Sequence, residues 1–94
     1  MPWLLLDGLP LSFTDEDLRR ICVPFGIVVQ AHLVRMPDGT PIGFGRVEMG
    51  AMDEAEAARQ GLDGRSLAHH TITVRHLTRE EEPPSGSPSS SAAF

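Results

Sequence analysis

Four histidines and one cysteine are the first candidates in this sequence for a metal ligand or a nucleophile. His69 and His70 are adjacent, so on a strand they would face opposite ways, and no second cysteine completes a tetrahedral set. Cys22 falls on the apolar stripe of an expected helix, where a cysteine is most simply a small core residue. The chain holds no lysine, so it lacks the Gly-Lys-Ser/Thr of a phosphate-cradling loop. We therefore expect no catalysis, no metal and no cofactor.

A second group of residues suits the binding of planar and anionic groups. Phe44 lies between Gly43 and Gly45, which leave its ring little packing within its own strand. An outward aromatic ring of this kind often marks an interface. Arg46 can lay its guanidinium on a planar group or pair with an anion. An ion pair with a neighbouring carboxylate on the same surface is the alternative for this arginine.

The elements that position these residues alternate along the chain. Period-two or apolar runs predict strands at residues 3–6, 27–35, 42–49 and 71–75. Thr14 is the expected N-cap of a first helix, with acids in its first turn, and Pro24 and Gly26 end that helix. Asp53 resembles a second helix start, and Gly61 fits the end of that helix. The order β-α-β-β-α-β predicts an α+β, ferredoxin-like fold: a four-stranded antiparallel sheet with both helices on one face.

Strand alternation assigns side chains to the face of this sheet that the helices leave open. The residues expected there are Trp3, Leu5, Gln30, His32, Phe44, Arg46, Thr73 and Arg75. Their surface would be partly aromatic, locally positive and able to form hydrogen bonds. Trp3 has two interpretations, because an indole near a chain end can be an exposed platform or can fold over the sheet as a cap.

The charge of the chain argues against binding to a polyanion by bulk electrostatics. The 94 residues include 8 Lys+Arg and 13 Asp+Glu, which gives a net charge of −5. Three of the acids are consecutive at residues 80–82, and the remaining ten acids against eight arginines leave −2. Because nonspecific nucleic-acid affinity grows with the number of phosphates neutralised, any such binding must depend on local geometry.

Length and composition predict one domain at residues 1–79 and a disordered tail at residues 80–94, which is acidic at first and then rich in Pro and Ser. No run approaches the ~18 apolar residues of a membrane helix, and the apolar start lacks the flanks of a signal peptide. A lone cysteine suits a reducing compartment. We expect a cytoplasmic protein that does not bind membranes, or a nuclear one in a eukaryote.

With these elements in place, residues 3–77 resemble the RNA recognition motif family. The first-strand hexamer of that family is aliphatic, aromatic, aliphatic, x, Asn, Leu, and the sequence here is Leu4-Leu5-Leu6-Asp7-Gly8-Leu9. The third-strand octamer is Lys/Arg-Gly-aromatic-Gly/Ala-aromatic-Val-x-aromatic. Here it is Ile42-Gly43-Phe44-Gly45-Arg46-Val47-Glu48-Met49.

The resemblance implies binding of single-stranded RNA by stacking of bases on the open sheet face. In the family the hexamer's second position and the octamer's third and fifth carry the rings. Phe44 keeps one of the three, whereas Leu5 and Arg46 replace the other two. A stacked base is worth roughly 1–3 kcal/mol, so two lost rings could cost on the order of 2–6 kcal/mol of affinity before compensation.

We therefore expect weak RNA binding of modest specificity by Phe44, Arg46, Trp3, Leu5, Arg75, Gln30 and His32, with Arg79 reaching phosphates or base edges. The alternative is a protein-interaction module that binds a peptide or a second copy of itself and no RNA. A peptide-binding branch of the family uses an acidic first helix and an Arg-x-Phe turn. This chain has Asp15-Glu16-Asp17 but Arg65-Ser66-Leu67, without the Phe.

Overall fold

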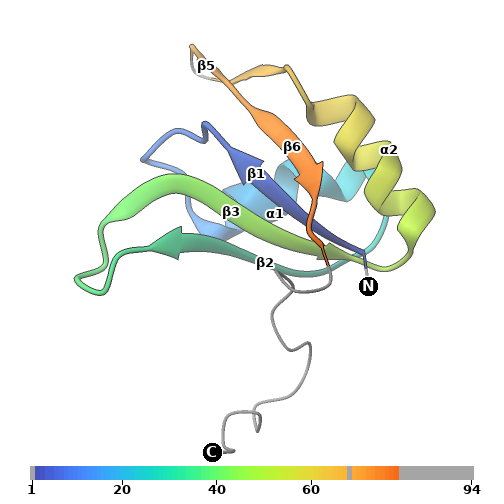
Figure 1. Cartoon of the computed structure of the whole chain (residues 1–94), viewed down its shortest axis with the longest axis horizontal. Helices are drawn as coiled ribbons and strands as arrows, with labels where there is room; N and C mark the ends of the chain where they lie inside the picture. The colour runs from blue at the N-terminus through green and yellow to red at the C-terminus, as the bar shows by residue number, and fades with distance from the viewer. Residues whose placement is uncertain (1, 68, 79–94) are drawn as a thin grey trace, which may run out of the picture.

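The computed structural model describes residues 2–67 and 69–78. These residues form a sheet, two α-helices, a 3-10 turn (η1) and a small hairpin, which follow one another along the chain as shown in Figure 1. In chain order they are β1 (Trp3–Asp7), α1 (Asp15–Cys22), η1 (Val23–Phe25), β2 (Val28–Arg35), β3 (Pro41–Met49), α2 (Met52–Leu62), β4 (Ser66–Leu67), β5 (His70–Thr71) and β6 (Thr73–His76).

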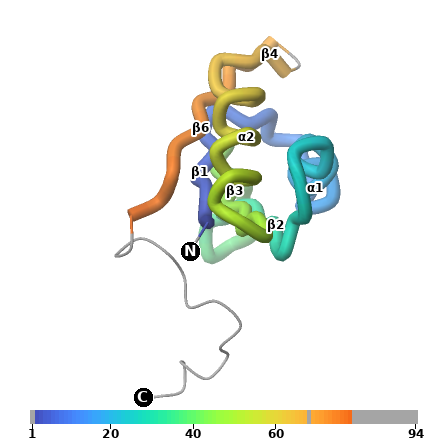
Figure 2. The backbone as a smooth tube through the Cα atoms, turned by 90° about the vertical axis from the view of Figure 1, so that its right-hand side faces the viewer, coloured from blue at the N-terminus to red at the C-terminus, as the bar shows by residue number. Residues whose placement is uncertain are grey.

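The main sheet is antiparallel throughout and has the strand order β2-β3-β1-β6. Both helices lie on one side of it, and the chain that follows β6 turns away toward the other side (Figure 2). This arrangement confirms the predicted ferredoxin-like α+β fold. The central strands β1 and β3 carry the two sequence motifs, so the fold places the hexamer and the octamer side by side.

Helix α1 begins where the sequence predicts. Thr14 Oγ1 accepts a hydrogen bond from the backbone N–H of Asp17 at 3.1 Å, and Asp17 Oδ2 accepts one from the backbone N–H of Thr14 at 3.1 Å. This reciprocal pair is a capping box, which satisfies two N–H groups that a helix start otherwise leaves open. Asp15 uses its position in the first turn differently, because its Oδ1 accepts a hydrogen bond from the backbone N–H of Leu33 in β2 at 2.9 Å. Through Asp15, the first turn of α1 is therefore also tied to β2, the edge strand of the sheet.

The apolar core lies between the sheet and the helices. The strands contribute Leu4, Leu6, Val47, Met49 and Val74, and the helices contribute Leu18, Cys22, Ala55, Ala58 and Leu62, all buried. Burial of a side chain the size of leucine is worth about 1.5–3 kcal/mol, so this layer supplies much of the stability of the fold. Burial also raises the pKa of the Cys22 thiol to about 12, so the thiol stays neutral at physiological pH. Cys22 is a core residue, as expected.

The second helix ends at Leu62, so Gly61 lies in its last turn, as the sequence predicts. The ring of Phe25 in η1 occupies the space that a Cβ on Gly61 would need. The missing side chain lets α2 approach the turn that follows α1. Gly61 therefore allows close contact between α2 and η1. Gly64, at φ +81°, makes the turn beyond the helix.

The predicted last strand at residues 71–75 is shifted and divided. A hairpin of β4 and β5 comes first, and β6 then pairs with β1. Between them Ile72 is fully buried, and its backbone N–H donates to the carbonyl of Arg65 at 2.9 Å. The predicted tail, the domain boundary at residue 79 and Arg79 lie outside the described residues. Among the helices of the described part, none is long and apolar enough to cross a membrane.

Candidate nucleic-acid interface

The strand register divides the open face of the sheet into three rows that run across the strands. We call the middle one the arginine row, which consists of His32 (β2), Arg46 (β3), Leu5 (β1) and Arg75 (β6). The phenylalanine row lies on one side and consists of Phe44, Asp7 and Thr73. The buried row lies on the other side and consists of Gln30, Glu48, Trp3 and Leu77. All seven predicted binding residues are in these rows.

In the phenylalanine row, two glycines fix the direction of the Phe44 ring. A Cβ on Gly45 would stand 2.7 Å from Leu18 Cδ2, so the bare glycine lets β3 pack closely on α1. Gly43 has φ +84°, and its carbonyl accepts a hydrogen bond from the backbone N–H of Leu9 at 2.9 Å. Glycine adopts this conformation at no steric cost. Phe44, held between them, is half-buried on the opposite side of the strand from Leu18.

The arginine row presents positive groups on the open face. Arg75 and His32 are exposed at its two ends, and Arg46 and Leu5 are half-buried at its centre. Leu5 stands directly between the two arginines in the register. Because neighbouring strands are about 4.8 Å apart, the backbones at Arg46 and Arg75 are about 10 Å apart. The row therefore offers two guanidinium groups on either side of an apolar side chain.

In the buried row, the structure favours the second of the two interpretations of Trp3, the cap, over the exposed platform. Trp3 is only 2% exposed, Glu48 5% and Leu77 9%, although these residues lie on the face without helices. The backbone N–H of Leu77 donates to the carbonyl of Trp3 at 3.0 Å, so the chain stays beside β1 after β6 ends. An indole that is covered in this way offers no free ring face to a base. Parity placed Trp3 on the correct face but could not show that this end of the face is closed.

Gln30 and His32 are also less free than the sequence suggests. Gln30 Nε2 donates to Glu48 Oε1 at 2.9 Å, and Gln30 Oε1 lies 3.2 Å from His32 Nε2. Nδ1 of the same His32 ring lies 4.0 Å from Asp15 Oδ2 of α1. The amide of Gln30 thus joins β2 to β3 within the protein. His32 keeps an exposed ring, whereas Gln30 contributes mainly by holding its neighbours.

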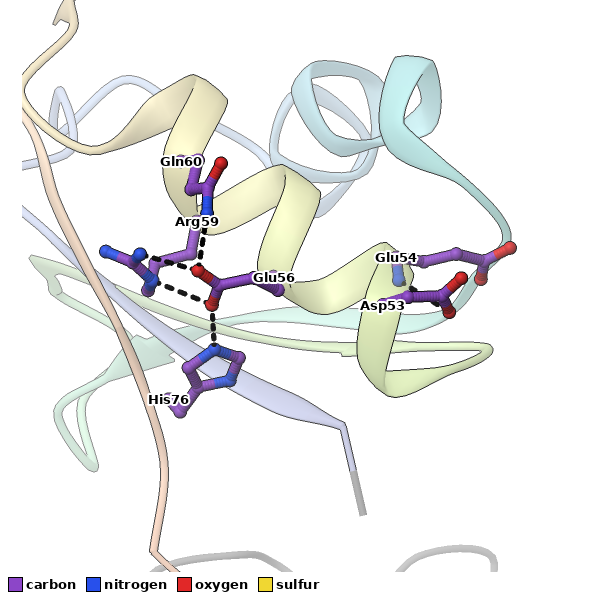
Figure 3. A network of polar contacts seen from close by, with 6 residues as sticks. All are labelled: Asp53, Glu54, Glu56, Arg59, Gln60 and His76. Atoms are coloured by element: carbon purple, nitrogen blue, oxygen red, sulfur yellow. Dashed lines mark hydrogen bonds and ion pairs between the residues drawn. The ribbon is translucent and has the colours of Figure 1, made fainter.

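A second polar cluster, which sequence reasoning missed, joins α2 to β6 on the helix side of the sheet (Figure 3). Glu56 accepts hydrogen bonds from Arg59 Nη2 at 2.6 Å, from His76 Nε2 at 2.7 Å and from Gln60 Nε2 at 2.8 Å. These donors, first among them Arg59, hold the pKa of the Glu56 carboxyl well below its usual range. The i+3 and i+4 spacing of Arg59 and Gln60 was visible in the sequence. The contact with His76 required the fold, and it makes the cluster a structural tie.

A cluster of side chains that could hold a metal ion is one feature the structure can show or lack. Among residues 2–67 and 69–78, no group of three or more His, Cys, Asp or Glu side chains is placed to hold a metal ion. The histidines of the described part lie instead in the arginine row, in the β5 region and in the Glu56 cluster. The accessible part of the open face brings together the ring of Phe44 and the guanidinium groups of Arg46 and Arg75. Such groups can bind a ligand.

Comparison with known proteins agrees with this geometry. A family model described as the RNA recognition motif matches residues 4–73. Polyadenylate-binding protein 2 of Arabidopsis thaliana is 33% identical over 79 residues, which cover 84% of this chain and 13% of the relative. The human spliceosome associated factor 3, a U4/U6 recycling protein, is 35% identical over 71 residues, which cover 76% of this chain and 7% of the relative. The chain thus spans about an eighth or less of the length of these relatives.

Solved structures show the same fold. The RNA15 RRM structure superposes with a TM-score of 0.79 at 19% identity, covering 84% of this chain and 92% of that one. A Sex-lethal protein–RNA complex superposes with a TM-score of 0.76 at 26% identity, covering 81% of this chain and 47% of that one. Both matches cover more than four fifths of this chain.

Proposed function

The chain belongs to the RNA recognition motif family, and we propose that it binds single-stranded RNA through the open face of its sheet. The observation that carries this proposal is the pairing of the half-buried Phe44 ring with an adjacent row that holds Arg46 and Arg75. Proteins that bind single strands combine a ring on which a base stacks with positive groups that track the backbone. Both components lie side by side here.

Each part of the face has a defined role in this proposal. Phe44 stacks one base, which is worth roughly 1–3 kcal/mol. Arg46 and Arg75 pair with phosphates or with base edges, because a guanidinium forms bidentate hydrogen bonds with such groups. Leu5 between them covers the apolar edge of a base or sugar. Trp3 has no direct role, since it is buried.

The same face sets the strength of the interaction. With one ring in place of the three that the family pattern provides, we expect contact with two to four nucleotides, weak affinity and modest specificity. The relatives support the class of ligand: one is named a polyadenylate-binding protein, and one solved structure is a protein–RNA complex. The proposal includes no catalytic step and no cofactor, because a stacking and ion-pairing face needs neither.

The test compares single strands with duplexes. Fluorescently labelled eight-nucleotide RNAs, tested single-stranded and annealed to their complements, are titrated with the full chain while anisotropy is recorded. We expect saturable binding of the single strands only, because the base faces of a duplex are stacked inside the helix and cannot reach Phe44. Equal affinity for the duplex, or no binding of either form, would contradict the proposal. Light scattering of the RNA-free protein reports whether a dimer forms instead.

A further inference from the structure

A short acidic stretch of the same chain follows the last strand closely in the sequence. Residues 80–82 are three consecutive glutamates, which we call the acidic segment, and they come four residues after β6 ends at His76. Arg75 of the arginine row is five residues before the first of them. The arginine row itself consists of His32, Arg46, Leu5 and Arg75, and none of these four residues is acidic.

The path of the described chain leads toward the open face. Leu77 donates its backbone N–H to the carbonyl of Trp3, so at this point the chain still lies against β1. Figure 2 shows that the end of the described chain, residues 77 and 78, turns to the side of the sheet away from α1 and α2. Leu77 is one row away from Arg75, and rows are two residues apart along a strand, or about 7 Å.

The acidic segment is within reach of both arginines. An extended chain advances at most about 3.3–3.6 Å per residue, so the three to five residues from Leu77 to the acidic segment span about 10–18 Å. This span covers the distance to Arg75 and also to Arg46, two strands away. A segment tethered so closely has an effective concentration in the millimolar range at its target. Carboxylates and RNA phosphates would then compete for the same guanidinium groups.

We propose that the acidic segment binds the arginine row of its own chain and weakens the binding of RNA to that row. The proposal rests on the proposed function, since it names the regulation of the same face. It explains why a face with two arginines belongs to a chain whose net charge is −5. Backbone phosphates displace the glutamates only when base stacking on Phe44 adds to the attraction. RNA that cannot place a base on Phe44 is thereby excluded.

The test neutralises the acidic segment and compares it with a matched control. The variant E80Q/E81Q removes two negative charges from the segment. The control E16Q/D53N removes two exposed acids from the first turns of α1 and α2, on the helix side. Exposed ion pairs are worth about 0.2–1 kcal/mol each, so we expect E80Q/E81Q to bind single-stranded RNA about 2- to 30-fold more tightly at low salt. We expect the control to change affinity less, and high salt to remove the difference.

A second measurement on RNA-free protein separates this inference from the proposed function. The amide and guanidinium Nε–H signals of Arg46 and Arg75 should move in E80Q/E81Q and stay in place in E16Q/D53N. If RNA binds both variants equally and these signals do not move, the inference is overturned while RNA binding stands. If the signals move but neither variant binds RNA, the proposed RNA binding is wrong, and so is the competition between RNA and the acidic segment. The contact between the acidic segment and the arginine row would still stand. Signals that depend on protein concentration would show a second copy as the occupant and overturn binding within one chain.

Discussion

The arginine row and the buried row lie on the same face of the same sheet, two residues apart along each strand, yet they differ in almost every property that decides function. The arginine row is open, with Arg75 and His32 exposed. In the buried row Trp3 is 2% exposed, and the Glu48 carboxylate, 5% exposed, accepts a hydrogen bond from Gln30. The difference shows that the side of a sheet on which a residue lies does not determine its access to a ligand. The packing around that residue decides its access as well.

The largest expected effect is on stability and comes from the buried row. Trp3→Ala removes a large side chain that is 98% buried, so we expect a loss of about 3–5 kcal/mol in the free energy of unfolding, measured by urea denaturation. Trp3→Phe should lose much less, because an aromatic ring still fills most of the space. If Trp3→Ala stayed fully stable but lost RNA affinity, the indole would be a binding platform and the comparison of the rows would fail.

The next effect is on affinity and comes from the phenylalanine row. Phe44→Leu keeps an apolar side chain but removes the ring, so RNA affinity should fall by about 1–3 kcal/mol, or roughly 5- to 150-fold, in an anisotropy titration. Phe13→Leu is the matched control, since Phe13 packs against the core and lies outside the three rows. The control should lower stability while the folded fraction keeps its affinity for RNA. Equal losses of affinity in both variants would show that Phe44 acts only through the fold.

A smaller effect should appear in the salt dependence of binding. Arg46→Gln removes one guanidinium from the arginine row, so the slope of log K against log salt concentration should become shallower by about 0.7 if that group neutralises one phosphate. Arg20→Gln removes the same charge from an exposed position on α1, where Arg20 lies 3.8 Å from Glu16. This control should leave the slope nearly unchanged. Equal changes of slope would mean that net charge, and not the row, attracts the RNA.

The smallest effect concerns the Glu56 cluster on the helix side, whose contribution to stability should depend on pH. The pKa of Glu56 is lower in the folded state than its unfolded value of about 4.3, so the cluster stabilises the fold above that pH. This stability is lost as the pH falls below about 4 toward the folded pKa. Glu56→Gln should therefore lower the Tm at pH 7 slightly and flatten its decline in acid. An unchanged acid profile in Glu56→Gln would show that the cluster does not tie α2 to β6.

The fold could be predicted from the sequence because its signals are local. The capping residues Thr14 and Asp17 act within one turn, and the alternation in β3 needs only the residues of that strand. The packing role of Gly61 could not be predicted, because the ring of Phe25, which leaves no room for a side chain there, belongs to another element. Local patterns therefore predict where elements form, and the contacts between elements require the fold.

The candidate site was predictable in part. Parity put Phe44, Arg46 and Arg75 on one face, and the register then placed the arginines in one row. The burial of Trp3 was not predictable, since strand alternation gives the face on which a residue lies and not how far it is covered there. The engagement of Gln30 with Glu48 likewise needed the register of β2 against β3.

The central claim, that RNA meets the arginine and phenylalanine rows, is tested most directly by mapping amide shifts of the full chain during titration with a randomised pool of short single-stranded RNAs. We predict that the amides of Leu5, Phe44, Arg46 and Arg75 move first and furthest, while those of α1 and α2 stay nearly fixed. Signals that stay unmoved on these strands at millimolar RNA, or that move mainly on the helices, would contradict the account.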